Sequence, residues 1–330
     1  MPPHDLVIIG AGPAGLAAAI AAKRHGLDYQ VLEKGLLVNS LAHYPTNMVF
    51  FTTPELLEIG GLPFTSPYDK PTRQEALHYY RRVVETFGIE VSFDETVLAI
   101  RGSGDGAPFE VESRDRLGET RVRRARTVVV AIGAYDRPNR LGVPGEDLPH
   151  VSHYYTEAHV GFRREVVVVG GKNSAAEAAL ELFRAGARVT LVHRGPALGA
   201  SIKYWVKPDI ENRIKEGSIA ARFGTVVEEI RPSSVVVSSA GRREEIPAEV
   251  VLLLTGYRPD LDLLARAGVV IEGEAVAPRH DPETFETNVT GLFVAGAVVA
   301  GAESGRIFIE NGRFHGERVV EAIRKRLVAD

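Results

Sequence analysis

The sequence predicts an α/β fold built from two Rossmann-like dinucleotide-binding domains, and three observations lead to it. An apolar run at residues 6–9 enters a glycine-rich turn that is followed by an Ala-rich stretch and a second apolar run. The same order recurs at residues 165–192. Two further apolar runs, at 127–131 and 250–254, each end in a glycine turn. Alternation of strands and helices of this kind is typical of parallel βαβ units.

The first unit has a distinct role for each glycine. Gly10 permits the tight turn, Gly12 lets the backbone approach a pyrophosphate, and Gly15 lets the helix pack closely on the strand. The N–H groups at the start of the helix then face the phosphates. Glu33 lies 18 residues after Gly15, where a carboxylate can accept both ribose hydroxyls. We assign this site to FAD, with contacts expected from Gly10, Gly12, Pro13, Ala14, Gly15, Glu33 and Lys34.

The second unit carries a different residue at the place of the acid. Counting 23 residues from Gly10 reaches Glu33, and the same count from Gly170 reaches His193, which Arg194 follows. A carboxylate at that place would repel a 2′-phosphate, whereas Arg194 and the nearby Lys203 would attract it. The pattern therefore predicts NADPH rather than NADH. The alternative interpretation is a solvated His-Arg pair at the end of a strand.

Lys172 stands where the middle glycine of the second turn is expected. It either obstructs the pyrophosphate, extends outward and pairs with it, or is a solvated turn lysine. Ala175, in the third glycine's place, is compatible with NADP-type sites. A helix is expected over 176–185. The predicted NADPH contacts are Gly170, Lys172, Asn173, Ser174, Ala175, His193, Arg194 and Lys203.

The remaining segments predict a discontinuous first domain. The strands that end at Gly133 and Gly256 each carry the chain from one domain to the other. We therefore expect an FAD-binding domain at 1–140 and 256–330 with an NADPH-binding domain inserted at 141–255. Thr72, with Glu75 three residues later, predicts the start of a helix over 72–87. Residues 36–70 are predicted to be irregular, 291–296 a strand and 304–327 helical.

Several motifs together resemble the bacillithiol disulfide reductase (YpdA-type) family among the thioredoxin reductase-like flavoproteins. They cover nearly the whole chain: Gly10-Ala-Gly-Pro-Ala-Gly-Leu16, Leu32-Glu-Lys-Gly35, Asn39-Ser40, Phe50-Phe51, Leu57-Glu-Ile-Gly60, Gly171-Lys-Asn-Ser-Ala175, Ser201-Ile-Lys203, Thr255-Gly-Tyr257 and Ile307-Phe-Ile-Glu-Asn-Gly-Arg-Phe-His-Gly316. That family also has a lysine in its second glycine turn. The resemblance implies FAD, NADPH and the reduction of a small disulfide.

Two departures from the resembling proteins stand out. Thioredoxin reductases have an Asp after the glycine of their late strand, and here Ala297 follows Gly296, a position that is also apolar in the YpdA-type family. That family has a cysteine in its first glycine turn, where this chain has Ala14. The chain has no cysteine at all, so the two dithiol positions of related reductases, within 152–157 and 39–44, are also without thiols.

Flavin contacts outside the first glycine turn are expected from four segments. By resemblance and by their position after the ribose strand, Asn39, Ser40, Tyr44, Pro45 and Met48 line approaches to the ring, and the strand ends contribute Gly133, Gly296 and Ala297. A helix that begins near Ser304 is predicted to aim its positive end at the ring's pyrimidine side, with Glu310, Asn311 and Arg313 in its early turns. A structural interface helix is the alternative. His43 and His315 are the candidate acid/base residues.

Three function hypotheses remain open. The first is an NADPH-dependent reductase of a small bacillithiol-type disulfide that works without its own thiol. The second is an NADPH-dependent flavin oxidase or reductase of oxygen, a quinone or a ferredoxin-like protein. The third is a flavin-bound redox sensor.

Charge and apolar run length indicate which classes of binding partner are expected. The net charge of −4 gives no basic footprint for nucleic acid, and the apolar runs are too short to span a membrane. With no signal sequence evident, a cytoplasmic location is expected. The expected partners are a small-molecule electron acceptor and further copies of the chain, in a dimer or tetramer.

Overall fold

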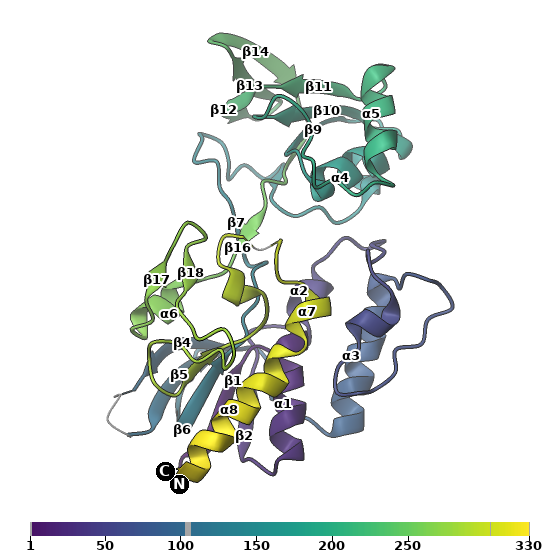
Figure 1. The fold of residues 1–330 in the computed structure, drawn as a ribbon. Coiled ribbons are helices and arrows are strands. Elements are labelled where there is room, and N and C mark those ends of the chain that lie inside the picture. Colours follow the sequence, from purple (N-terminus) through teal and green to yellow (C-terminus); the bar gives the residue numbers. More distant parts are fainter. Residues whose placement is uncertain (1, 103–106, 304, 330) are drawn as a thin grey trace. The chain divides into compact units, whose positions relative to one another are not determined.

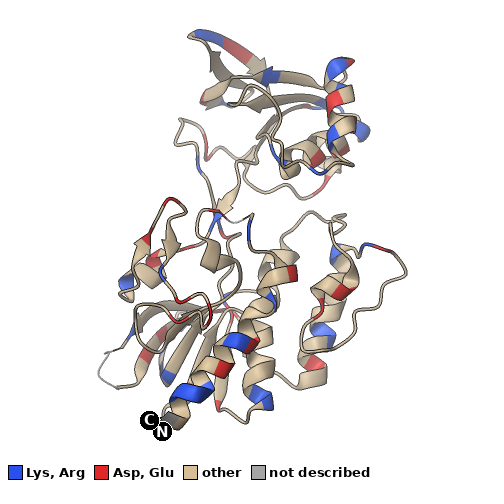
Figure 2. Cartoon of the chain, in the orientation of Figure 1, with Lys and Arg blue, Asp and Glu red and all other residues tan. Residues whose placement is uncertain are grey.

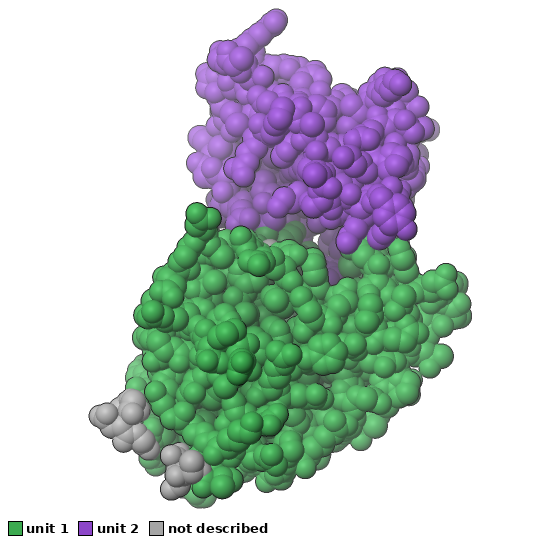
Figure 3. Space-filling model, viewed as in Figure 1, with its two compact units in different colours: residues 1–42, 48–137, 257–330 green, residues 43–47, 138–256 purple. Residues whose placement is uncertain are grey.

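The computed structural model describes residues 2–102, 107–303 and 305–329 of the 330-residue chain, which form two compact units (Figure 3). Unit 1 comprises 1–42, 48–137 and 257–330, and unit 2 comprises 43–47 and 138–256. Each unit contains a sheet whose central strands are parallel, with helices packed against it, so the predicted α/β fold class is confirmed (Figure 1).

Unit 1 begins with the predicted strand, turn, helix and strand. Its elements are β1 (His4–Ile9), α1 (Pro13–Arg24), β2 (Tyr29–Leu32), α2 (Asn39–Ala42), η1 (Pro54–Leu57), α3 (Arg73–Phe87), β3 (Val91–Ser92), β4 (Glu95–Arg101), β5 (Phe109–Asp115), β6 (Thr120–Val130), β7 (Arg137–Pro138, at the boundary), β16 (Tyr257–Arg258), α6 (Asp262–Arg266), β17 (Ile271–Glu272), β18 (Ala277–Pro278), β19 (Leu292–Val294), η3 (Gly296–Ala300), α7 (Ile309–Gly312) and α8 (His315–Ala329).

The sheet of unit 1 has the order β3-β2-β1-β6-β5-β4, and β19 also pairs with β6. Strands β3, β2, β1, β6 and β19 are parallel, whereas β4 and β5 extend the sheet antiparallel. Successive residues of a strand face opposite sides. Accordingly Val7 and Ile9 share one core cluster with Leu263 and Leu264 of α6. On the other side α1 packs against α8 (Figure 1).

Helix α3 is the clearest case of local sequence determining an element. Thr72 is its N-cap, and the Thr72 and Glu75 side chains form the predicted capping box. Gly88 ends the helix in the left-handed conformation, with φ of 56°. The predicted helix is therefore confirmed to within one residue.

Unit 2 repeats the strand, turn, helix and strand order. Its elements are β8 (Val151–Ser152), η2 (Ala158–Gly161), β9 (Glu165–Val169), α4 (Asn173–Arg184), β10 (Arg188–His193), α5 (Lys207–Lys215), β11 (Ala220–Phe223), β12 (Val226–Arg231), β13 (Ser234–Ser239), β14 (Arg242–Pro247) and β15 (Val250–Leu253). Helix α4 begins three residues before the predicted start, because the chain turns helical directly after Lys172.

Two sheets form unit 2: a parallel sheet in the order β11-β10-β9-β15-β8 and an antiparallel sheet in the order β12-β13-β14. Val166 and Val168 of β9 pack in one core cluster with α4, and Val167 and Val169 pack in another with Val235 of β13. The parallel sheet is therefore covered on both faces, as its continuous valine run requires.

The boundaries differ slightly from the predicted ones. The first crossing falls at Arg137–Pro138 instead of after 140, and the second at Gly256–Tyr257. Residues 43–47, predicted within the first domain, group with unit 2, since the Thr46 N–H donates to the Thr156 carbonyl at 2.8 Å. Lys and Arg are interspersed with Asp and Glu in both units (Figure 2).

The prediction of one helix from Ser304 is wrong in its start and its continuity. Ser304 itself lies outside the described residues, and the first helix of this region is the four-residue α7, which begins at Ile309. The long helix α8 begins only at His315. A four-residue helix sums few peptide dipoles, so α7 does not provide the positive end that was predicted for a long helix.

Candidate functional site

The first glycine turn contains two glycines with no space for a side chain, Gly10 and Gly15, and one glycine beside open space, Gly12. A Cβ atom built on Gly10 (φ 108°) would lie 2.5 Å from the Ala131 carbonyl oxygen, and one on Gly15 would lie 1.9 Å from the Gly10 carbonyl oxygen. A Cβ on Gly12 would meet no atom within 4 Å. No side chain caps the α1 N-terminus at Gly12. The open space and the uncapped N–H groups form a cradle suited to a pyrophosphate.

Glu33 lies at the end of β2 beside this cradle. Its side chain is buried, and its two carboxylate oxygens accept from the N–H groups of Ala11 (2.8 Å) and Gly35 (3.0 Å). Burial raises the pKa of Glu33, and these two hydrogen bonds oppose that effect. A carboxylate has about four acceptor positions, so lone pairs remain for ribose hydroxyls. The neighbouring Lys34 pairs with Asp136 at 2.7 Å.

The C-terminal segment closes the other side of the first turn. A Cβ built on Gly296 (φ 75°) would lie 2.8 Å from the Ala14 Cβ, and one on Gly312 would lie 3.4 Å from the Gly296 Cα. The start of α8 meets α1 equally closely, since a Cβ on Gly316 would lie 2.3 Å from the Ala18 nitrogen. Residues from both ends of the chain thus surround Ala14, which is half-buried, as is Ala297.

His315 has a contact that sequence reasoning missed. Its Nδ1 accepts from the Gly296 N–H at 3.2 Å, and its ring stacks on Phe285 with centroids 4.1 Å apart. Burial, followed by the charge of Arg318, lowers the pKa of His315 to about 4. The neutral ring therefore holds the backbone beside Ala14, which favours a positioning role over acid/base chemistry. His43 lies exposed in the segment that groups with unit 2.

Two of the side chains predicted to contact the flavin ring, Asn311 and Arg313, form hydrogen bonds with backbone groups of the protein. The Asn311 Oδ1 accepts from the Phe308 N–H at 2.8 Å, and its Nδ2 donates to the Arg306 carbonyl at 2.9 Å. Arg313 donates from Nη1 to the carbonyls of Glu55 and Glu58, at 2.7 and 2.8 Å. These two side chains therefore shape α7 and tie it to η1. The half-buried Glu310 lies directly before Asn311 in the chain.

The segment after β2 divides between the two units. The Asn39 Oδ1 accepts from the Leu36 N–H at 3.1 Å, and a Cβ on Gly133 (φ 71°) would lie 3.8 Å from the Ser40 Oγ. Met48 accepts from the Arg73 N–H at 2.8 Å through its carbonyl. These three residues lie in unit 1, whereas the half-buried Tyr44 and Pro45 group with unit 2.

The second glycine turn repeats the backbone of the first with different side chains. A Cβ on Gly170 (φ 155°) would lie 2.6 Å from the Leu254 carbonyl oxygen and 2.8 Å from the Ala175 Cβ. No side chain caps α4 at Lys172, whose side chain is exposed, as is that of Ser174. The Lys172 side chain is therefore accessible to solvent beside the uncapped start of α4.

Strand pairing confirms that His193 occupies the register of Glu33. Ile9 pairs with Leu32 in unit 1, and Val169 pairs with Val192 in unit 2. A Cβ on Gly171 would lie 2.3 Å from the His193 ring, and one on Gly195 would lie 2.7 Å from its Nε2. Burial, followed by Arg194, lowers the pKa of His193. At neutral pH the charge at this strand end therefore comes from the exposed Arg194.

The loop at residues 199–203 is hydrogen-bonded to the second glycine turn, a contact that the sequence analysis did not predict. The Gly199 N–H donates to the Gly171 carbonyl at 2.8 Å. Asn173 accepts from the Lys203 N–H at 2.9 Å and donates from Nδ2 to the Ser201 carbonyl at 3.2 Å. Asn173 thus brings Lys203 to the start of α4. The glycines after His193 were the available signal, because such residues permit close backbone contact.

The helix N-terminus and the neighbouring charged residue determine which ligand each glycine turn can bind. Each unit offers an uncapped helix N-terminus behind a glycine turn, and the charged residue beside the turn is Glu33 in unit 1 and Arg194 in unit 2. The residues present fit FAD in the first cradle and a nicotinamide dinucleotide in the second. Across the described part of the chain, no helix has the length and apolar character needed to cross a membrane.

Comparison with known proteins agrees with this architecture. Residues 7–296 match the profile of the family described as pyridine nucleotide-disulphide oxidoreductase. The bacilliredoxin reductase Bdr of Bacillus subtilis (strain 168) is 45% identical over 322 residues, which cover 97% of each protein. The structure of bacillithiol disulfide reductase Bdr (YpdA) from Bacillus cereus covers 98% of this chain and 100% of that chain, with 42% identity and a TM-score of 0.95. Lactococcus lactis thioredoxin reductase (FR conformation), 24% identical, shares the fold with a TM-score of 0.78 over 99% of this chain and 100% of that chain.

Proposed function

The chain belongs to the bacillithiol disulfide reductase family of the pyridine nucleotide-disulphide oxidoreductases, and we propose that it is an FAD-dependent NADPH oxidoreductase of a small bacillithiol-type disulfide. The net reaction consumes NADPH, a proton and one disulfide, and it yields NADP⁺ and two thiols. Bound FAD would supply the two-electron carrier between nicotinamide and disulfide.

The observation that carries this proposal is the opposite charge at the matching strand ends of the two units, from Glu33 in unit 1 and from Arg194, next to His193, in unit 2. Glu33 in unit 1 suits ribose hydroxyls, which donate hydrogen bonds. Arg194, with Lys203 brought to the start of α4 by Asn173, suits a 2′-phosphate. A chain with this pair of sites is equipped for FAD in unit 1 and NADPH in unit 2.

The lack of cysteine supports a specific form of this proposal. A disulfide reductase ordinarily opens its substrate through a protein thiolate. This chain has no cysteine, so the substrate disulfide has to meet the reduced cofactor directly. Ala14 is half-buried beside Gly296 and carries only a methyl group, and we place the approach of the substrate sulfur at this position.

The same absence favours a second candidate, an NADPH-dependent oxidase or reductase of oxygen, a quinone or a ferredoxin-like protein. None of these acceptors needs a protein thiol. A third possibility, a redox sensor with negligible turnover, differs from both because it would not require rapid reduction by NADPH.

The deciding experiment is anaerobic stopped-flow reduction of the purified protein. We expect copurified FAD to be bleached quickly by NADPH and much more slowly by NADH. The reduced protein is then mixed with bacillithiol disulfide, a quinone or oxygen, and reoxidation by the disulfide is expected to be fastest. Faster reoxidation by quinone or oxygen would establish the second candidate, and slow bleaching by NADPH would establish the sensor.

A cysteine variant tests the role given to residue 14. We expect Ala14→Cys to raise the rate of disulfide reduction by about tenfold or more, because a positioned thiolate adds nucleophilic catalysis. Thiol-blocking reagents should remove that gain and leave the natural protein unaffected. Ser174→Cys, at the matching position of unit 2, is the control and should bring no gain. An unchanged disulfide rate in Ala14→Cys would contradict substrate approach at this position.

A further inference from the structure

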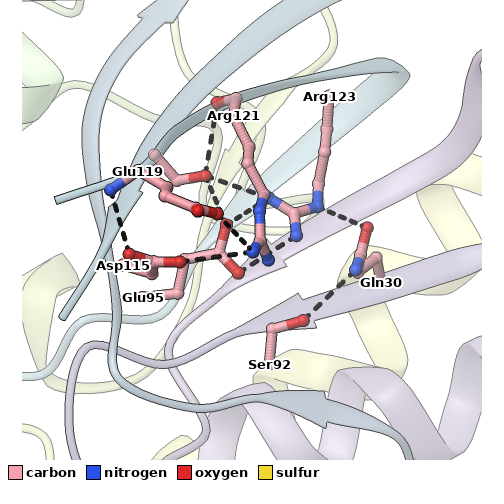
Figure 4. Close-up of polar contacts among 8 residues, drawn as sticks. Gln30, Ser92, Glu95, Asp115, Glu119, Arg121 and Arg123 are labelled. Carbon is pink, nitrogen blue, oxygen red and sulfur yellow. Dashed lines mark hydrogen bonds and ion pairs between the residues drawn. The ribbon is translucent and has the colours of Figure 1, made fainter. Parts of the chain in front are cut away.

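A polar network that connects five strands of unit 1 (β2, β3, β4, β5 and β6) lies next to the backbone of Glu33. Arg123 of β6 forms an ion pair with Glu95 at the start of β4, with its Nη2 3.0 Å from the Glu95 Oε2 (Figure 4). The Glu95 and Arg123 side chains are 2% and 13% exposed. Ser113 donates to Glu95 at 2.5 Å and accepts from Arg123 at 2.9 Å. Every charge of this pair is therefore matched within the fold.

Arg123 also reaches the strand that carries Glu33. Its Nε donates to the Gln30 Oε1 at 2.6 Å, and the Gln30 Nε2 donates to the Ser92 Oγ at 3.3 Å (Figure 4). Gln30 lies on β2, three residues before Glu33. One guanidinium thus joins β6, β4 and β2, which a single ammonium group could not do in the same geometry.

The segment from Ser92 to Glu95, which this network holds, forms hydrogen bonds with the backbone of Glu33 on both sides. The Glu33 N–H donates to the Ser92 carbonyl at 2.9 Å, and the Glu95 N–H donates to the Glu33 carbonyl at 2.9 Å. Between them Asp94 has φ of 53°, a left-handed conformation that is unfavourable for a residue with a Cβ. The contacts of Ser92 and Glu95 on either side hold this segment in place.

We propose that Arg123 and Glu95 are positioning residues that set the place of the Glu33 carboxylate and thereby the affinity for FAD. This inference rests on the proposed FAD site of unit 1. Arg123 does not touch the cradle: it acts through Gln30, Ser92 and Glu95 on the Glu33 backbone. A buried ion pair is often dispensable for stability when apolar residues replace it, so its effect on FAD is separable from its effect on folding.

The test measures the FAD dissociation constant of the deflavinated protein by flavin fluorescence in four forms: natural, Arg123→Lys, Glu33→Gln and the double variant. Lysine keeps the charge pair with Glu95, so the fold survives, but it loses the link to Gln30. We expect Arg123→Lys to weaken FAD binding about tenfold, the order found when partners that orient a direct ligand are changed. In the Glu33→Gln background the same change should matter less than about twofold, because coupled residues are not additive.

Arg121→Lys is the matched control. Arg121 lies two residues earlier on β6, on the same face, and pairs with Asp115 at 3.2 Å and Glu119 at 3.3 Å, away from Gln30 (Figure 4). The FAD affinity of the Arg121→Lys variant should equal that of the natural protein. Unchanged affinity in Arg123→Lys, or an equal loss with and without Glu33, would overturn the proposal. If Arg123→Lys does not fold, Glu95→Met with Arg123→Met repeats the comparison with an apolar pair. A natural protein that binds no FAD would instead refute the proposed function.

Discussion

The two glycine turns share a backbone but differ in most of their side chains, and the strand ends beside them also differ. Gly12, Gly15 and Glu33 in unit 1 correspond to Lys172, Ala175 and His193 in unit 2. Glu33 fastens its carboxylate to the N–H of Ala11, whereas the His193 ring lies flat against the matching Gly171. Strand register and helix start are thus common to both units, and the residues at the strand end and the middle turn position decide which charge each site offers.

The largest effect is expected from the open glycine of unit 1. Gly12→Val should leave the fold intact, since a Cβ there meets no protein atom within 4 Å, but it should block the pyrophosphate. Losing two charge-assisted hydrogen bonds would cost about 3–6 kcal/mol, or at least ~100-fold in FAD affinity. Flavin absorbance per protein and circular dichroism measure the two quantities. A fully yellow variant would refute the assignment of this turn.

Acid stability should depend on unit 1 through His315. Its folded pKa of about 4 lies below the ordinary 6.5, so the stabilisation is complete above pH 6.5 and is lost as the pH falls toward 4. The shift corresponds to about 3 kcal/mol. Thermal unfolding across this range should show a shallower pH dependence in His315→Asn, which can still accept from Gly296. His43→Asn, at an exposed position, is the control, and an equal change in both variants would contradict the role of His315.

Cofactor choice should depend on unit 2. Arg194→Ala should raise the NADPH dissociation constant about 10–100-fold, the value of a charged hydrogen bond of ~1.5–3 kcal/mol, and leave that of NADH unchanged. Calorimetric titration gives both constants. Arg188→Ala, at the opposite end of β10, removes an exposed partner of Glu165 and should change neither constant. Equal losses for the two nucleotides in Arg194→Ala would exclude a 2′-phosphate contact.

The smallest effect should come from Lys172. Its exposed side chain can add only a surface charge contact of about 0–1 kcal/mol, so Lys172→Ala should weaken NADPH binding less than ~fivefold. The same titration measures it. A loss greater than about tenfold would make Lys172 a principal phosphate ligand. The second turn would then bind the phosphate through a side chain more than through backbone N–H groups.

Local patterns were reliable where short-range hydrogen bonds and sterics decide the structure. The capping box of Thr72 and Glu75, the strand registers of both units and the close approach of Gly15 to Gly10 all follow from residues near one another in the chain. The helix expected from residue 304 was misjudged, because the helical periodicity of that region does not show the break between Gly312 and His315.

The sequence by itself determined the two nucleotide-binding units and the place of Glu33 and Arg194, because a glycine turn and a strand end depend on short-range backbone geometry. Only the tertiary structure decided that Ala14 lies against Gly296, that His315 holds the Gly296 N–H, and that Arg123 supports the strand of Glu33. The Ala14, Gly296 and Arg123 contacts join segments far apart in the chain, and such contacts arise from the packing of whole elements, which no local pattern records.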